Sequence, residues 1–203
     1  MTKPVLNILV ACEYSGRVRD AFRRAGHNAW SCDLLPTEVE GPHYQGDVRD
    51  ILPRAWDMLI AHPECTFLCN SGVRWLTTEE GRYEKLDEAA AFYNLFLNAD
   101  HIPKRAIENP VMHRYAKQRL THYNGVMSFQ PWEHGHRELK RTCLQLVGLP
   151  PLKPSNVVGP PPTDPRERAK WAVVHRMSPG PNRWKDRSRT YAGVAQAMAD
   201  QWG

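Results

Sequence analysis

The chain has 203 residues, of which 41% are hydrophobic and 24% charged, and its net charge is +5. These values are close to those of globular proteins, so they exclude wholesale disorder and predict one domain over residues 1–203 with a sizeable core. No apolar run approaches the roughly 20 residues of a membrane helix, and the N-terminus lacks a signal-peptide pattern. We therefore expect a cytoplasmic protein with no membrane partner. The positive charge permits a polyanionic partner without requiring one.

The first 33 residues read as a strand–helix–strand unit. Residues 5–11 are nearly all apolar, as in a buried parallel strand, and a turn follows at 12–16. Residues 17–25 form an amphipathic helix that Gly26 stops, and residues 27–32 form a second strand that ends at Asp33. Parallel strands joined in this way imply an α/β fold, with a mostly parallel, doubly wound sheet covered by helices on both faces.

The rest of the chain continues this alternation more loosely. We expect a helix near 48–52, a buried strand at 56–61, a polar stretch at 62–82, the longest helix at 84–98, a short strand at 105–107 and a closing helix at 191–202. Prolines are dense from 150 to 162, and basic residues from 165 to 187. Because proline cannot continue a regular helix or a central strand, we expect residues 150–187 to be a Pro-rich and basic loop region within the domain.

The turn after the first strand of such a sheet is where nucleotide-like cofactors bind. Gly16 allows the backbone to approach a ligand closely, and Glu13 is placed to meet the ligand's amino-acid end. Asp33, at the end of the second strand, suits ribose hydroxyls, and Asp47 suits an adenine amino group. Because no G-x-G-x-x-G fingerprint is present, the pattern favours S-adenosylmethionine over a dinucleotide. An ordinary strand–helix turn is the alternative interpretation.

Cys65 lies just beyond the predicted strand 56–61, at the end that faces the crevice of a doubly wound sheet. A partly exposed, polar setting of this kind draws a thiol toward the reactive thiolate. Glu108 and Asn109 leave the end of the next apolar strand, so we expect them in the same crevice, with Asn109 orienting Glu108 or the nucleophile loop. One thiol and one carboxyl group are the minimum machinery for one particular reaction. A cytosine ring becomes open to thiol attack at carbon 6 when an acid protonates or hydrogen-bonds its ring nitrogen 3. A structural cysteine and a helix-capping acid are the alternatives.

Two metal hypotheses compete with this interpretation. The sequence His62-Pro63-Glu64 matches one half of the zinc deaminase signature, but the P-C-x-x-C half is absent downstream. A structural zinc site needs four converging ligands, and the histidines and the five cysteines are scattered without a C-x-x-C pair. We therefore expect no bound metal. The odd number of cysteines and the absence of an export signal also argue against a disulfide framework.

Taken in order, these segments resemble the DNA cytosine carbon-5 methyltransferases, and most closely the short phage-type members that lack a separate target-recognition domain. The resemblance is carried by a first cofactor motif at 11–16, acids at 33 and 47, a Pro-Cys-like nucleophile motif at 62–65, a Glu-Asn motif at 108–110, a basic motif at 140–142 and a closing segment at 189–195. The cysteine and Glu-Asn motifs are the specific ones.

The resemblance implies a Rossmann-like fold and S-adenosylmethionine-dependent methylation of DNA at carbon 5 of cytosine, through a covalent cysteine adduct. It implies that the catalytic residues are Cys65, Glu108 and Asn109. It implies that the cofactor contacts are Glu13, Tyr14, Ser15, Gly16, Asp33, Leu34, Asp47 and Pro63. It implies that the substrate contacts are Ser71, Arg74 (beside Trp75), Lys140 and Arg141. Protection of phage DNA in a host cytoplasm is the role that the likeness suggests.

The sequence departs from the family at two motifs. Glu64 stands before the nucleophile where the family usually has proline, and we expect its charge to raise the thiol pKa. The first motif also lacks the usual Phe-x-Gly-x-Gly pattern. Two other functions therefore remain open: methylation of a free cytidine nucleotide or of RNA, and an inactive methyltransferase fold that only binds DNA.

Overall fold

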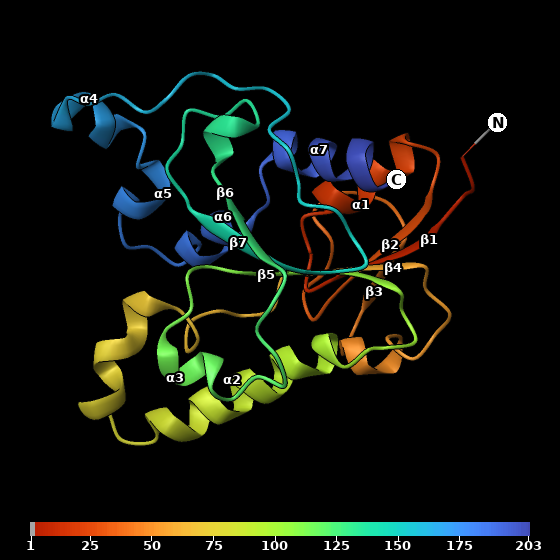
Figure 1. The fold of residues 1–203 in the computed structure, drawn as a ribbon, viewed down its shortest axis with the longest axis horizontal. Coiled ribbons are helices and arrows are strands. Elements are labelled where there is room, and N and C mark those ends of the chain that lie inside the picture. Colours follow the sequence, from red (N-terminus) through yellow and green to blue (C-terminus); the bar gives the residue numbers. More distant parts are fainter. Residues whose placement is uncertain (1–2) are drawn as a thin grey trace.

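A seven-stranded sheet runs through the computed structural model, which describes residues 3–203 (Figure 1). Its strand order is β3-β2-β1-β4-β5-β7-β6. The pairs from β3 to β5 are parallel, whereas β7 runs antiparallel to both β5 and β6. The strands are β1 (Asn7–Ala11), β2 (Asn28–Asp33), β3 (His43–Gln45), β4 (Met58–Ala61), β5 (Lys104–Asn109), β6 (Val126–Phe129) and β7 (Thr142–Val147).

Helices cover both faces of this sheet. In Figure 1, α1 (Arg17–Arg24) and α7 (Ala192–Trp202) lie on one face, and α2 (Arg82–Leu97) and α3 (Arg114–Lys117) lie on the other. The short helical segments are η1 (Val48–Asp50), η2 (Asn70–Thr77), η3 (Pro131–Glu133), α4 (Pro165–Lys170), α5 (Val173–Arg176) and α6 (Arg183–Ser188). A mostly parallel sheet between two helical layers confirms the predicted Rossmann-like α/β class.

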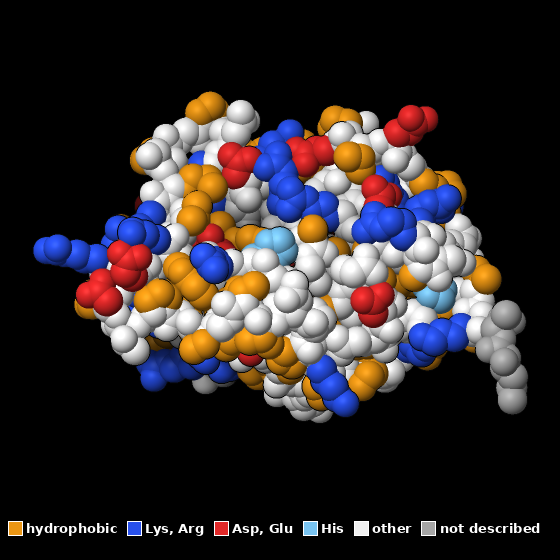
Figure 2. Space-filling view, turned by 90° about the horizontal axis from the view of Figure 1, so that it is seen from above, with side chains coloured by type: hydrophobic (Ala, Val, Ile, Leu, Met, Phe, Trp, Pro, Cys, Tyr) orange, Lys and Arg blue, Asp and Glu red, His pale blue; other side chains and the backbone are white. Residues whose placement is uncertain are grey.

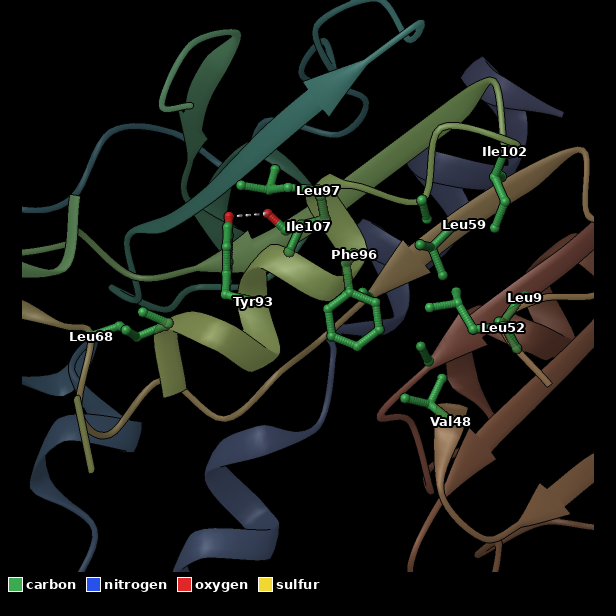
Figure 3. Close-up of a cluster of buried hydrophobic side chains, with 14 of the residues drawn as sticks. Leu9, Val48, Leu52, Leu59, Leu68, Tyr93, Phe96, Leu97, Ile102 and Ile107 are labelled. Atoms are coloured by element: carbon green, nitrogen blue, oxygen red, sulfur yellow. Dashed lines mark hydrogen bonds between the residues drawn. The ribbon is translucent and has the colours of Figure 1, made fainter. Parts of the chain in front are cut away.

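Alternating side chains of the central strands build a separate core on each face. Leu9, Leu59 and Ile107 point toward α2, where they pack with Tyr93 and Phe96 (Figure 3). The Tyr93 hydroxyl donates to the Ile107 carbonyl at 3.4 Å, which ties α2 to β5 (Figure 3). The intervening strand residues point the other way and pack against α1 and α7. Burial on both faces explains why these strands read as continuous apolar runs.

The sequence did not predict β6 and β7. In β7 the apolar run is interrupted by Gln145, which is 1% exposed. Its amide is satisfied inside the fold, because its side chain accepts from the Tyr93 hydroxyl at 3.5 Å and donates to the His122 carbonyl at 3.1 Å. A buried glutamine with tertiary partners looks like a surface residue in the sequence, so the strand escaped detection.

The expectation of a loop over 150–187 is corrected in its second half, which contains α4, α5 and most of α6. Asp164 accepts from the backbone amides of Arg166 and Glu167 at 3.0 and 2.9 Å, and Pro165 occupies the first helical position. These are ordinary helix-start signals, but each helix has only four to six residues and too few apolar positions to show a period. Within residues 3–203 no helix is long and apolar enough to cross a membrane.

We predict that Gly193→Ala destabilises the fold by about 2 kcal/mol, as overpacking does. A Cβ at Gly193 would overlap the backbone carbonyl of His134, which α7 packs against. Because alanine is normally better than glycine in a helix by about 1 kcal/mol, a loss of stability would isolate the steric clash. Urea unfolding followed by circular dichroism measures it. Gly180→Ala is the control, since a Cβ there meets nothing within 4 Å; equal stability of the two variants would contradict the packing.

Candidate active site

The register between β4 and β5 brings a histidine and a glutamate together at one end of the sheet. Ala61 pairs with Ile107, so the next residues, His62 and Glu108, leave neighbouring strands side by side. His62 Nδ1 lies 2.5 Å from Glu108 Oε2, and the two side chains are 8% and 19% exposed. Glu108 therefore occupies the predicted place at the carboxyl ends of the strands, but with a partner that the sequence did not reveal.

The electrostatics of this pair favour its ionised form. Burial opposes a charge on His62, but the hydrogen bond and the negative charge of Glu108 outweigh it and raise the histidine pKa. Burial likewise opposes a charge on Glu108, yet the hydrogen bond and charge of His62, helped by Lys140, lower the carboxyl pKa. These contacts therefore favour an imidazolium next to a carboxylate.

Two buried polar atoms at this place have no partner among the described residues. One is Nε2 of His62, and the other is Oδ1 of Asn109, whose residue is 3% exposed. Buried polar groups are normally satisfied, so an unpartnered atom of this kind is a candidate contact for a ligand. The Asn109 amide donates to the carbonyl of Pro110 at 2.5 Å, so its nitrogen does not orient Glu108 as expected. His62 does that instead.

Cys65 follows His62 in the segment after β4 and forms a pair with Cys69. The amide of Cys69 donates to the Cys65 carbonyl at 3.1 Å, and this turn brings the two thiols close enough to change each other's pKa. The interaction with the Cys69 thiol, burial, and the negative charges of Cys69 and Glu108 raise the pKa of Cys65. Glu108 thus acts electrostatically on Cys65, and a crevice shared by the thiol and the carboxylate stays a prediction.

Cys69 is the more acidic thiol of the pair. The interaction with the Cys65 thiol lowers its pKa to about 5 against the effect of burial, with further help from the Ser71 hydroxyl and the backbone amides of Ser71 and Gly72. Cys69 Sγ lies 3.0 Å from Ser71 Oγ, at the N-terminal end of η2. Near neutral pH the pair of thiols thus holds one proton and one negative charge.

Glu64 does not have the influence expected from the sequence. Its exposed side chain accepts a hydrogen bond from the Thr66 hydroxyl at 2.7 Å. The main contributions to the raised pKa of Cys65 come from Cys69, burial and Glu108. The physical reason is the orientation of the Glu64 side chain, which bonds with Thr66 on the exposed side of the segment. Pro63, between His62 and Glu64, is buried.

Lys140 brings a cation to the same crevice from the segment before β7. With Glu108, Thr190 and Tyr191 it lines a cavity of about 10 Å³. Such a volume holds about one water molecule. The Lys140 ammonium donates to the Arg187 carbonyl at 2.8 Å, and the Tyr191 hydroxyl is buried without a partner among the described residues. A planar base therefore enters only if the segment near Tyr191 moves.

The turn between β1 and α1 has an unusual backbone. Cys12 has a φ of 57°, a left-handed conformation that is rare for residues other than glycine and is concentrated at functional sites. Gly16 has a φ of 70°, and a Cβ there would clash with the Arg19 guanidinium. Both positions bend the chain so that it approaches the crevice closely. This is the geometry expected of a cofactor turn, and it needs glycine at 16.

The side chains of this turn are already engaged within the protein. Glu13 accepts from the Val18 amide at 2.8 Å and the Ser15 hydroxyl at 3.0 Å, so it caps the start of α1. Tyr14 is 5% exposed and donates to the Lys185 carbonyl at 2.6 Å. Contacts of Glu13, Tyr14 and Ser15 with a ligand stay predictions. Part of the turn backbone is engaged as well, because the Glu13 amide donates to the Cys32 carbonyl and the Tyr14 carbonyl accepts from the Glu38 amide.

Asp33 and Leu34 fit a ribose and a flat apolar ring. Burial raises the pKa of Asp33 despite hydrogen bonds from the amides of Leu35 and Leu34 and the opposing charge of His43. A half-buried acid of this kind suits hydroxyl donors. Leu34 is 74% exposed, which is unusual for leucine. Asp47 accepts from the Arg49 amide and guanidinium at 2.9 and 2.7 Å, so its contact with an adenine amino group stays a prediction. The residues present therefore fit S-adenosylmethionine in part.

The remaining predicted substrate residues lie on the surface. The guanidinium of Arg74 stacks on the ring of Trp75, 4.2 Å from its centroid, and both side chains are exposed on η2. Ser71 contacts Cys69 as described, which places it near the nucleophile. Arg141 is exposed, and its side chain makes no hydrogen bond within residues 3–203. Their substrate contacts stay predictions.

Sequence reasoning missed His62 and Cys69 as functional residues. A signal was present for His62, because it follows a buried strand in the same way as Glu108 follows the next one. Its match to half of a zinc motif drew attention to metals instead. Within residues 3–203, no group of three or more His, Cys, Asp and Glu side chains is arranged to hold a metal ion.

Neither a protein-family model nor a curated protein matches this sequence. Solved structures with a similar fold include the Entamoeba histolytica methyltransferase EhMeth, at 14% identity and a TM-score of 0.48 over 76% of this chain and 58% of that one. They also include the S. pombe Dnmt2 methyltransferase, at 12% identity and a TM-score of 0.45 over 73% and 51%. This chain thus spans little more than half the length of those proteins. Such a likeness concerns the general fold alone.

We predict that iodoacetamide alkylates Cys69 before Cys65. Because the pKa of Cys69 is about 5, its thiolate is fully formed from pH 6 to 8 and its alkylation rate should stay nearly constant. An ordinary thiol with a pKa near 8.5 would instead react about tenfold faster per pH unit. Peptide mass spectrometry of short alkylation pulses measures both sites, with Cys69→Ser as the control. Faster modification of Cys65, or a tenfold rise per unit at Cys69, would contradict the assignment.

Proposed function

We propose that this chain transfers a methyl group from S-adenosylmethionine to carbon 5 of cytosine in DNA, with Cys65 as the nucleophile. The observation that carries the proposal is the placement of His62 and Glu108, 2.5 Å apart at the carboxyl ends of β4 and β5, with Lys140 on the same small cavity as Glu108 and Cys65 three residues after His62. A thiol for carbon 6 and an acidic group for the pyrimidine edge are what the chemistry requires.

The chain's own residues divide the work on the base. Glu108 presents its carboxyl group to the ring nitrogen 3 and the 4-amino group of a cytosine that has been flipped out or taken from a single strand. Lys140, on the other side of the small cavity, is a cation for the base or a phosphate. Cys65 Sγ then bonds to carbon 6, and the electron pair of the 5,6 double bond becomes available at carbon 5. When bound, S-adenosylmethionine supplies the methyl group as an electrophile.

Cys69 supplies a place for the proton of the nucleophile. The two thiols share one proton near neutral pH, and Cys65 becomes a thiolate when that proton sits on Cys69. Bond formation between Cys65 and carbon 6 therefore needs no further base. After carbon 5 releases its proton to water, the bond between carbon 6 and sulfur breaks and Cys65 recovers the shared proton.

We predict that DNA containing 5-fluorocytosine forms a covalent adduct with the wild type in the presence of S-adenosylmethionine. Fluorine at carbon 5 cannot leave as a proton, so the protein should stay attached to the base. Cys65→Ser should abolish the adduct, whereas Cys143→Ala, which removes a buried thiol of β7, should retain it. Denaturing gel electrophoresis and intact mass measure the adduct.

Methyl transfer from labelled cofactor to DNA, RNA and dCMP then identifies the substrate. Label on DNA alone supports the proposal, and label on RNA or dCMP moves the same chemistry to one of the other substrates. If the wild type forms no adduct and labels none of the three, the catalytic proposal is wrong and the inactive DNA-binding fold is the remaining hypothesis. Circular dichroism confirms that the variants are folded.

The DNA part of the proposal is supported by the surface of the C-terminal segment. Figure 2 shows Lys and Arg side chains in several groups on the face that carries α4 and α7, with acidic side chains between them. Trp184, on α6, is 56% exposed, and an exposed indole is a platform on which unpaired bases stack. The Arg74–Trp75 stack on η2 offers a second such platform. We infer that α4 to α6 contact the phosphate backbone near the flipped base.

We predict that the double variant Arg166→Ala/Arg168→Ala binds DNA more weakly. Both arginines are exposed on α4, so their loss removes two phosphate contacts and leaves the core intact. The slope of log K against log salt should decrease in magnitude by about 2. Fluorescence anisotropy at several salt concentrations measures it. The control Arg23→Ala/Arg54→Ala makes the same charge change at exposed positions elsewhere. An equal effect of the control would mean that net charge, and not a contact of α4 with DNA, explains the weaker binding.

A further inference from the structure

Because His62 keeps Glu108 ionised, Glu108 alone lacks the proton that the reaction uses at ring nitrogen 3 of the cytosine. Attack on carbon 6 is helped by a proton at ring nitrogen 3 of the cytosine. A carboxylate held ionised by an imidazolium accepts hydrogen bonds, for example from the 4-amino group, but has no proton to give. The proton for ring nitrogen 3 must therefore come from a neighbour of Glu108, and this inference rests on the proposed function.

We propose that His62 supplies this proton to the base through Glu108. Its Nδ1 lies 2.5 Å from Glu108 Oε2, the shortest route from any ionisable nitrogen to the carboxyl group, and Lys140 is the other cation that faces it. His62 acts as a positioning residue that holds the proton, whereas Glu108 is the group that touches the base.

The transfer balances in atoms and charge. The Nδ1–H bond of His62 breaks and the proton joins the carboxyl group of Glu108. The carboxyl group then gives a proton to ring nitrogen 3, where a new N–H bond forms. Glu108 is a carboxylate before and after, His62 changes from imidazolium to neutral imidazole, and the positive charge moves to the base. When the methylated base leaves, the same path in reverse returns the proton.

The surroundings of His62 suit a residue that changes charge during the reaction. Glu13 faces it from the β1–α1 turn and Glu108 from β5, and both favour the imidazolium. Lys140 faces it from the segment before β7 and opposes that form, while the Cys65–Cys69 pair follows it on its own segment. Its Nε2 is buried without a partner among the described residues, so no second internal bond fixes the ring in one charge state.

The wild type provides the first test. If protonated His62 is required, kcat/KM for DNA should be constant at lower pH and fall as pH rises through the pKa of His62, which Glu108 raises above the ordinary value of about 6.5. Proton NMR of the imidazole measures that pKa without any activity. The midpoint of the alkaline limb and the NMR midpoint should coincide, and a rate that does not fall there overturns the proposal.

The variant His62→Asn provides the second test. Asparagine places an amide donor where Nδ1 stood, so it retains a hydrogen bond to Glu108 but carries no transferable proton. We predict that kcat/KM falls by about 100-fold, the effect of losing one general acid. The alkaline limb should also move to lower pH, because Glu108 must then take its proton from water and a carboxyl releases it more readily than imidazole does.

A purely structural role would lower the rate and leave the alkaline limb where it was, and that outcome overturns the proposal. His101→Asn is the matched control, since His101 is exposed and bonds the Leu52 carbonyl. The two proposals fail in different ways. Loss of label transfer in the wild type removes the proposed function and this inference with it, whereas an active wild type with an unmoved limb in His62→Asn removes this inference alone.

Discussion

The parallel pairing of β4 with β5 is the constraint on which the rest of the site depends. One register step, Ala61 against Ile107, decides that His62 and Glu108 lie side by side at the carboxyl ends of β4 and β5. The burial of two charges costs several kcal/mol for each ion, and the loss of one partner from such a pair costs roughly 3–5 kcal/mol. A shift of one residue would turn one side chain to the opposite face, so the apolar cores that fix the register also fix the charges.

The C-terminal segment completes the crevice from outside the sheet. Three parts of the fold hold the short stretch 185–190 through hydrogen bonds to its backbone carbonyls. The donors are the side chains of Tyr14 (to Lys185), Lys140 (to Arg187) and Arg17 (to Thr190). In each of these contacts a backbone carbonyl accepts the hydrogen bond. The contacts lie at the edge of the molecule, where local opening costs the least free energy. The stretch therefore encloses the cavity of about 10 Å³, and it is the part that the proposed function requires to move.

The sequence was most informative where burial is continuous. The strand–helix–strand unit at the N-terminus, α2 and α7 were predicted because apolar runs and helical spacing report burial directly. β7 was not predicted, because its buried Gln145 depends on hydrogen bonds with Tyr93 of α2 and with the carbonyl of His122. In the site, the order of motifs predicted that Cys65 and Glu108 share a crevice. The pairing of His62 with Glu108 was not predicted, because it depends on the register between two strands. The pairing of Cys65 with Cys69 was not predicted either, because it depends on the conformation of a turn.

The charges of the crevice explain why these unpredicted partners matter. Near neutral pH the carboxylate of Glu108 stands against the cations His62 and Lys140, and the thiol pair adds one negative charge. Each reacting group thus has a neighbour that holds its proton: Cys69 for Cys65, and His62 for Glu108. In a largely desolvated site a proton can move between such neighbours without creating an isolated charge, which water would otherwise have to stabilise. In the proposed reaction, the two pairs together would make the nucleophile and the acid available at the same pH.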